Sequence, residues 1–204
     1  MTRPLLICDC DEVLLHMVSH FRDWLGEARG IDFAYETGKF EDALTYRDVG
    51  ATVPPDQVWP LLAQFFEGEM HRQTLVPGAK QALETLGEVG DIVILTNIGH
   101  EAHALRVEQL KGFGLEHEVV TNRGGKGRPV VELLDRHEPT AAVFVDDLAG
   151  QHASVAKHAP KVRRLHMISE PALAPNVPKA DDAHARIDDW GEATQWILEQ
   201  WEAA

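Results

Sequence analysis

The sequence predicts an α/β protein in which a parallel sheet is sandwiched between helices, with a small α-helical cap inserted after the first strand. Two observations predict this fold class. From residue 77 onward, short apolar runs alternate with helical segments through short connections, as in parallel sheets covered by helices on both faces. Between residues 15 and 74 this alternation is broken by helix and loop without a convincing buried strand, which indicates an insertion.

The first part of the chain supplies one strand and two helices. Residues 4–8 form an apolar run typical of a strand, and residues 12–29 carry apolar side chains at helical spacing before Gly30. Residues 31–53 mix aromatic and charged side chains and are expected to be irregular. A helix then begins at Pro54 and Pro55 and extends to about residue 71. We therefore expect a core domain of residues 1–14 and 75–204 and a cap of residues 15–74.

The rest of the chain alternates strand and helix. Pro77 and Gly78 begin a helix, and the β-branched run at residues 91–95 is typical of a strand. By the same criteria we expect strands at 117–120, 141–145 and 162–168, and helices at 100–111, 128–137, 148–158 and 190–201. Residues 170–178 are rich in proline and are expected on the surface.

Composition excludes several classes of function. The chain has 204 residues and a formal net charge of −14, and so acidic a surface repels phosphate backbones, which disfavours nucleic-acid binding. No apolar stretch approaches the roughly 20 residues of a membrane span. The N-terminus leads directly into a strand-like run and does not resemble a signal peptide. We therefore expect a cytoplasmic protein that binds neither nucleic acid nor membrane.

Asp9 and Asp11 follow the first predicted strand directly. Ligands of open parallel sheets bind beyond the carboxyl ends of the strands, where these side chains lie. A carboxylate at Asp9 can attack phosphorus or bind a divalent cation through oxygen. Asp11 is close enough to protonate a leaving alkoxide and later to take a proton from water. Taken alone, such a pair is more often a turn or a helix cap.

Three further polar side chains follow later elements. Thr96 ends a predicted strand, and its hydroxyl together with a donor from Asn97 could hold a phosphoryl oxygen. Lys126 lies in a glycine-rich loop, which differs from a Walker-type phosphate loop because Gly127 replaces the Ser or Thr expected after the lysine. Taken alone, a residue such as Thr96 is more often a helix cap, and a loop lysine such as Lys126 is usually a solvated charge.

Asp146 and Asp147 follow the buried strand predicted at 141–145. Adjacent carboxylates repel each other, and a hard cation such as Mg²⁺ relieves the repulsion and prefers oxygen ligands. The alternative is a cap for the following helix. Because strand ends and one loop supply polar groups of suitable type in order along the chain, a shared site for metal-assisted phosphoryl transfer is the better interpretation.

These four blocks resemble the motifs of the haloacid dehalogenase-like (HAD) hydrolase superfamily. The first motif, Asp-x-Asp-x-Thr/Val after an apolar strand, is matched by Asp9, Asp11 and Val13. The later motifs are matched by Thr96, by Lys126, and by Asp146 with Asp147. The resemblance implies a Rossmann-like HAD core, a cap that closes over the substrate, and a Mg²⁺-dependent phosphatase that hydrolyses a small phosphomonoester through an aspartyl-phosphate intermediate.

The resemblance also implies a role for each residue. Asp9 would be the nucleophile and a Mg²⁺ ligand, and Asp11 the general acid/base with its backbone carbonyl on the metal. Thr96 and Lys126 would bind the phosphoryl group. One or both of Asp146 and Asp147 would complete the metal site, and Asp147 is preferred for direct ligation. The chain departs from the family at Glu12, where many members have glycine, which bears on the shape of the entrance and on anionic substrates.

Several alternatives stay open. A phosphomutase would keep Asp11, whereas hydrolysis of a carbon–halogen bond would give Asp11 no proton to transfer, because halide leaves unprotonated. A non-catalytic phosphate- or metal-binding module is compatible with Glu12 and a small cap. The expected partner is a small phosphorylated metabolite, whose identity, like the oligomeric state, the sequence does not specify. His16 and His20 are spaced to share a helical face but have no obvious third ligand, so a metal role is disfavoured.

Overall fold

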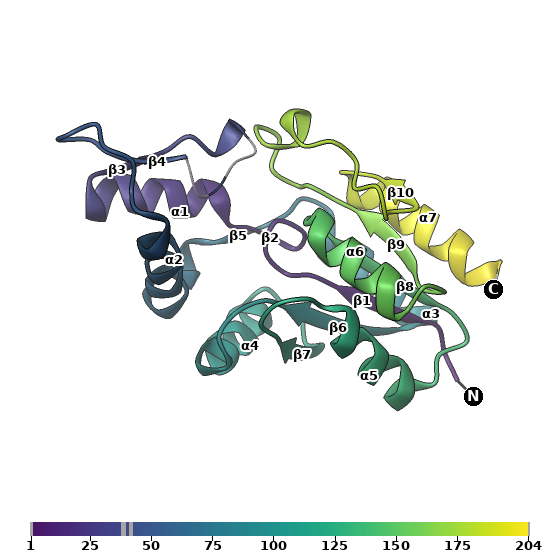
Figure 1. Cartoon of the computed structure of the whole chain (residues 1–204). Helices are drawn as coiled ribbons and strands as arrows, with labels where there is room; N and C mark the ends of the chain where they lie inside the picture. Colours follow the sequence, from purple (N-terminus) through teal and green to yellow (C-terminus); the bar gives the residue numbers. More distant parts are fainter. Residues whose placement is uncertain (1, 38–39, 41–42, 204) are drawn as a thin grey trace.

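The computed structural model describes residues 2–37, 40 and 43–203, so residues 38, 39, 41 and 42 of the segment expected to be irregular lie outside the described residues. The main sheet has six parallel strands in the order β10-β9-β8-β1-β6-β7 (Figure 1). These strands are β1 (Leu5–Cys8), β6 (Asp91–Thr96), β7 (Glu118–Thr121), β8 (Ala142–Asp146), β9 (Arg163–His166) and β10 (Ala185–Arg186). None of the described helices has the length and apolar composition needed to cross a membrane.

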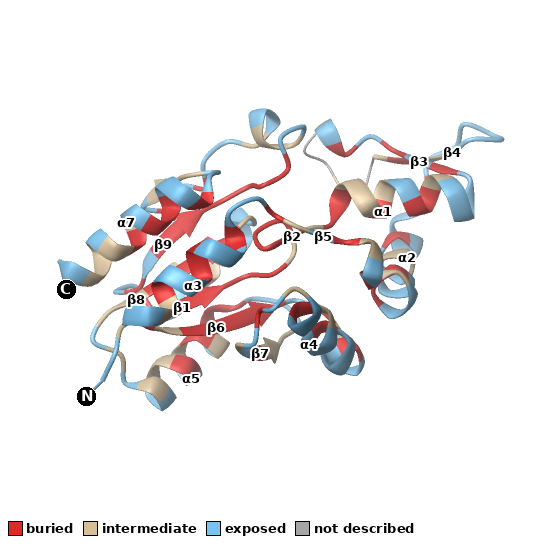
Figure 2. Cartoon of the chain, turned by 180° about the vertical axis from the view of Figure 1, so that it is seen from behind, coloured by how far each residue is buried: buried red, intermediate tan, exposed pale blue. Residues whose placement is uncertain are grey.

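Helices cover both faces of this sheet, and Figure 2 shows the strands buried between helices whose outer sides are exposed. The helices are α3 (Ala79–Val89), α4 (His103–Gly112), α5 (Gly127–His137), α6 (Ala149–His158) and α7 (Trp190–Glu202). On one face Leu83 of α3 and Trp190 of α7 pack in the same cluster as Leu6. On the other face Val130 of α5 packs in the same cluster as Leu5. The predicted α/β fold class is therefore confirmed, and strands buried on both faces explain the uninterrupted apolar runs.

The segment between β1 and α3 forms a second body beside the sheet (Figure 1). It is joined to the core through the antiparallel strands β2 (Leu15–His16) and β5 (Thr74–Leu75), which we call the stem. Its helices are α1 (Val18–Trp24), which continues into a π-helix (Leu25–Arg29), and α2 (Pro55–Gly68). Its core is aromatic: the ring of Phe21 lies 5.5 Å from that of Phe65 and 5.8 Å from that of Phe33, centre to centre.

Two expectations for this segment were wrong. The helix expected over residues 12–29 begins only at Val18, because Glu12 has the left-handed φ of 60° and residues 15–16 form β2, which pairs with β5. The segment expected to be irregular over 31–53 contains an antiparallel pair, β3 (Ile31–Phe33) and β4 (Leu44–Tyr46). Three-residue strands are too short for an alternating pattern to be recognised, and the same holds for the two-residue β10.

The buried aromatic cluster predicts a stability difference within this segment. Replacing the fully buried Phe65 by alanine removes ring contacts and leaves a cavity, so we expect Phe65→Ala to lower the free energy of unfolding by about 3–5 kcal/mol. Val49→Ala, at a side chain that is 70% exposed, is the control and is expected to change it by less than about 0.5 kcal/mol. Chemical denaturation measures both, and equal effects would contradict the packing described here.

Candidate active site

The carboxyl ends of three neighbouring strands meet at one place. Because β1 lies between β6 and β8, with Cys8 opposite both Ile94 and Val145, the residues that end these strands become neighbours. They are Asp9 after β1, Thr96 at the end of β6 and Asp146 at the end of β8. The sheet order therefore gathers groups that are far apart in the sequence.

Lys126 is the centre of this site. Its ammonium lies 2.8 Å from Asp9 Oδ1 and 2.7 Å from Asp146 Oδ2, and its side chain is 1% exposed. The loop before α5 places it there, and its backbone N–H donates to Gln151 Oε1 of α6 at 2.8 Å. Burial alone would lower the pKa of Lys126, but the charges of Asp146 and Asp9 outweigh it and raise the pKa above the usual range. Lys126 is therefore a permanent cation between two buried carboxyl groups.

Asp9 accepts a second hydrogen bond, from the backbone N–H of Cys10 at 2.7 Å, which fixes the direction of its carboxyl group. Burial raises the pKa of Asp9 to about 7, although the charge of Lys126 opposes the shift. A further positive charge beside Asp9 would favour its ionised form, which is the form that could act as a nucleophile.

Asp146 and Asp147 differ in what they contact. Asp146 is fully buried, and its two oxygens accept from Lys126 and from the backbone N–H of Leu148, the residue before α6, at 2.9 Å. The carboxylate of Asp147 accepts no hydrogen bond from the residues that the structure describes. Burial, followed by the charges of Asp146 and Asp9, raises the pKa of Asp147 well above its ordinary value. Asp147 therefore has its oxygens free for a cation.

One oxygen from each of Asp9, Asp146 and Asp147 can be chosen so that all three lie within 4.8 Å of one another. An all-oxygen donor set of this charge suits a hard divalent cation such as Mg²⁺. The unpartnered carboxylate of Asp147 is the feature that fits such an ion best. A cation would give this carboxylate a partner and would offset its repulsion from Asp146.

Asp11 is held by residues that the sequence interpretation missed. Arg106 Nη2 of α4 donates to Asp11 Oδ1 at 2.9 Å and Oδ2 at 3.0 Å, and Gln73 Nε2 donates to Oδ1 at 2.7 Å. Arg106 is fully buried. The sequence position of Arg106 could have indicated its burial. It lies four residues after Ala102 and four before Leu110, on the buried face of this helical segment. An arginine on an apolar face needs a buried acidic partner.

The two other predicted ligand side chains lie at the same sheet edge with different contacts. Thr96 is fully buried, and its hydroxyl lies 3.5 Å from Asp11 Oδ2, which is at the limit for a hydrogen bond. Asn97 is exposed, donates to the carbonyl of Gly124 at 2.8 Å and accepts from Asn122 at 2.9 Å. Asn97 thus ties the loop after β6 to the glycine-rich loop before Lys126, and its role toward substrate stays a prediction.

Glu12 turns its side chain toward the cap segment. Its Oε1 accepts from the backbone N–H groups of Met17 at 2.6 Å and Val18 at 2.7 Å and so caps the beginning of α1. The left-handed backbone at Glu12 is the conformation that glycine adopts without strain. The larger side chain is accommodated because it finds these backbone donors.

Comparisons with known proteins show the fold. The sequence matches no model of a protein family and no curated protein. Solved structures match over nearly the full chain. A HAD hydrolase from Bacillus subtilis, described as bound to magnesium, is 15% identical with a TM-score of 0.64, over 96% of this chain and 98% of that one. A predicted phosphoglycolate phosphatase from Haemophilus somnus is 15% identical with a TM-score of 0.62, over 95% and 97%.

A 2-haloacid dehalogenase from Pseudomonas syringae is also similar, at 16% identity and a TM-score of 0.57, over 98% of this chain and 99% of that one. The structural neighbours of this chain are HAD-superfamily hydrolases, as the sequence motifs implied. Because phosphatases and dehalogenases share this fold, the likeness shows the fold and does not identify the activity or the substrate of this chain.

The geometry predicts that Lys126 is essential for stability as well as for the site. Lys126→Met leaves Asp9 and Asp146 buried without their cation, so we expect the free energy of unfolding to fall by about 3–5 kcal/mol. Adding Asp146→Asn should recover part of this loss, because one uncompensated charge is removed. Lys157→Met, on an exposed lysine of α6, is the control. Urea denaturation of the four proteins checks this, and a Lys126→Met variant as stable as the control would refute it.

Proposed function

We propose that this chain is a Mg²⁺-dependent phosphatase that hydrolyses a small phosphomonoester through an aspartyl-phosphate intermediate on Asp9. The observation that carries the proposal is the ammonium of Lys126 between Asp9 and Asp146, with the unpartnered carboxylate of Asp147 beside them. A cation and a free acidic ligand next to a fixed carboxyl group are what in-line phosphoryl transfer to that group requires.

In the first step, the free oxygen of Asp9 attacks phosphorus, an acyl-phosphate bond forms, and the bond from phosphorus to the leaving alkoxide breaks. Its other oxygen stays on the Cys10 N–H and Lys126, so the side chain is already oriented. Lys126 and Thr96 would stabilise the spreading charge of the phosphoryl group from the strand ends. Asp11 would donate the proton that the leaving alkoxide needs.

In the second step, Asp11 takes a proton from water, and the resulting hydroxide attacks phosphorus and returns Asp9 to its carboxylate with release of phosphate. Arg106 and Gln73 hold Asp11 through three hydrogen bonds and thereby restrict where the proton is delivered. Gln73 immediately precedes β5 of the stem and donates a hydrogen bond to Asp11. We therefore also propose that residues 15–74 are a cap, and that a movement of this cap would change the position of Asp11 through Gln73.

Asp9, Asp147 and the backbone carbonyl of Asp11 would hold Mg²⁺, and Asp146 is the weaker candidate because both its oxygens already accept hydrogen bonds. When bound, Mg²⁺ would supply positive charge to the phosphoryl oxygens and favour the ionised form of Asp9. The magnesium described for the related Bacillus subtilis hydrolase supports this choice of ion.

Hydrolysis of a carbon–halogen bond is the second candidate, and the likeness to the Pseudomonas syringae dehalogenase favours it. The presence of Asp11 argues against it, because halide leaves without a proton and a general acid at Asp11 would have no proton to transfer. A phosphomutase would use the same first step and then return the phosphoryl group to the product. Phosphate release from a phosphomonoester separates it from the phosphatase proposed here.

Asp9→Asn should remove the nucleophile, so we expect kcat/KM for an aryl phosphate with Mg²⁺ to fall by about a thousandfold or more. Asp56→Asn, an exposed residue in the first turn of α2, is the matched control and should keep wild-type activity. Phosphate release and halide release from a 2-haloacid are assayed in parallel. A fully active Asp9→Asn variant would exclude covalent catalysis at this residue, and halide release in place of phosphate release would support the dehalogenase.

Metal removal gives a separate prediction. A chelator should abolish phosphate release, and Mg²⁺ should restore it. Asp147→Asn should raise the Mg²⁺ concentration for half-maximal activity by about tenfold or more, because a carboxylate without other partners is lost. Asp182→Asn, at an exposed aspartate away from the site, should leave it unchanged. Activity that is insensitive to the chelator would argue against a metal-dependent mechanism.

A further inference from the structure

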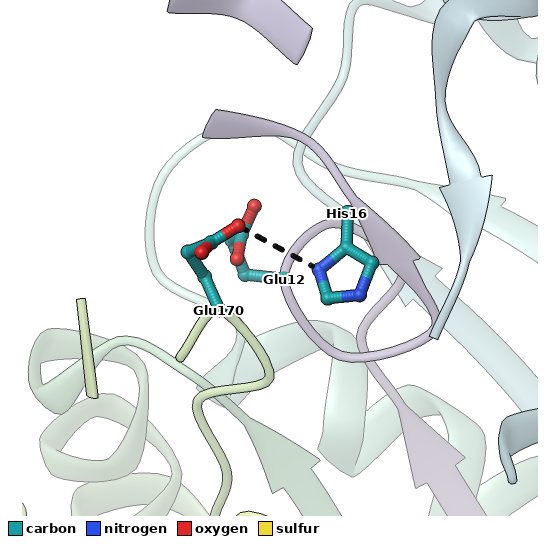
Figure 3. Close-up of side chains that lie close together, drawn as sticks. All are labelled: Glu12, His16 and Glu170. Carbon is teal, nitrogen blue, oxygen red and sulfur yellow. Dashed lines mark ion pairs between the residues drawn. The ribbon is translucent and has the colours of Figure 1, made fainter. Parts of the chain in front are cut away.

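A second group of metal-ligating side chains lies where the chain passes from the core into the cap segment. It consists of Glu12 in the turn after β1, His16 in β2 and Glu170 in the segment after β9 (Figure 3). We propose that these three residues bind a divalent transition-metal ion of the Zn²⁺ or Mn²⁺ class, at a site separate from Asp9, Asp146 and Asp147. No residue of this group belongs to the catalytic machinery proposed above.

The geometry of the three side chains suits one ion. A ligand atom from each can be chosen so that all lie within 4.8 Å of one another, and His16 Nδ1 is 3.9 Å from Glu170 Oε2. Figure 3 shows the carboxylates of Glu12 and Glu170 close together, with the imidazole of His16 beside Glu170. Since such ions bind their ligand atoms at about 2.0–2.2 Å, the ligand atoms of a tetrahedral site lie about 3.4 Å apart, and a small inward movement would complete the shell.

The second observation is an unpartnered atom. Glu12 is 2% exposed, and its Oε2 is buried without any hydrogen-bond partner among the described residues. The other oxygen is fixed by the backbone N–H groups of Met17 and Val18, so the free oxygen has a fixed direction. The Nδ1 atom of His16 likewise has no hydrogen bond. A buried carboxylate oxygen without a partner is costly, and a bound cation would remove that cost.

The surrounding charge also favours a cation. The charged groups that act most on Glu12 are Glu170 and Asp11, and both are acidic. An imidazole nitrogen with two carboxylates is a donor set for Zn²⁺, Mn²⁺ or Fe²⁺ and a poor one for Mg²⁺, which prefers oxygen and retains water. The ligand set therefore separates this site chemically from the all-oxygen site beside Lys126.

An ion here would join three parts of the molecule: the turn that carries Asp11 and Glu12, the stem and the segment after β9. It would fix the stem, through which the cap segment is attached, against the core. The sequence pair His16 and His20 was disfavoured for lack of a third ligand. The structure instead directs His20 to the hydroxyl of Thr74 at 3.0 Å and brings His16 beside Glu12 and Glu170.

The test is Zn²⁺ binding by the chelator-stripped full-length protein in excess Mg²⁺, which occupies an all-oxygen site. Calorimetry and metal analysis of the dialysed protein should give one Zn²⁺ per chain. His16→Gln and Glu170→Gln should each weaken binding by at least about tenfold, whereas His20→Gln and Asp147→Asn should bind like the wild type. Glu12 is left unchanged because its variants would also disturb the cap of α1.

Circular dichroism without metal establishes that each variant is folded, so loss of binding cannot be attributed to unfolding. Melting temperature supplies a second readout, since Zn²⁺ should raise it for the wild type and for His20→Gln but not for His16→Gln. Absence of Zn²⁺ binding in excess Mg²⁺, or unchanged binding in both His16→Gln and Glu170→Gln, would overturn the proposal. Because the readouts are binding and stability, this result is independent of whether the chain is a phosphatase.

Discussion

The contact of Lys126 with Asp9 and Asp146 is the interaction on which the rest of the site depends. Two ionised carboxylates that are almost fully buried repel each other strongly, and the cation between Asp9 and Asp146 offsets that repulsion. This single ammonium connects the ends of β1 and β8 to the glycine-rich loop before α5. Gln151 of α6 holds the backbone of Lys126, so the helix after Asp146 also fixes the cation that Asp146 needs. The side chain and the backbone of Lys126 are therefore both held by hydrogen bonds.

Much of this arrangement could be predicted from the sequence, because parallel strands buried on both faces give apolar runs that end sharply. Asp9, Thr96 and Asp146 are visible as polar residues at those ends, and strand order then brings them together. Arg106 could not be placed in this way, since only its contact with Asp11 shows what it does. Glu170 was missed because its neighbours are distant in sequence, and no local pattern links it to His16.

The conformation at Glu12 explains a larger error of sequence interpretation. Apolar side chains from residue 13 onward have helical spacing, yet the backbone turns at Glu12 and the helix begins only at Val18. The apolar spacing correctly predicted that Val13 and Leu14 are buried. These two side chains pack in the main core, however, and do not lie on the face of a helix. Apolar spacing alone cannot separate these cases when a turn follows a strand. The turn forms without glycine because the side chain of Glu12 accepts a hydrogen bond from the backbone at the beginning of α1.

The balance of charge around the end of β1 constrains what the protein binds. Six carboxyl groups gather there, from Asp9, Asp11, Glu12, Asp146, Asp147 and Glu170, and the described basic side chains that contact them are those of Lys126 and Arg106, with His16 beside Glu170. A phosphoryl group carries further negative charge, so it cannot approach unless cations offset the excess. Arg106 is already committed to Asp11 and Lys126 to two carboxyl groups. The proposed phosphate-binding role and the proposed metal requirement therefore depend on the same electrostatic condition. A chain that bound phosphate tightly without any metal would show that the excess charge is removed by protonation instead.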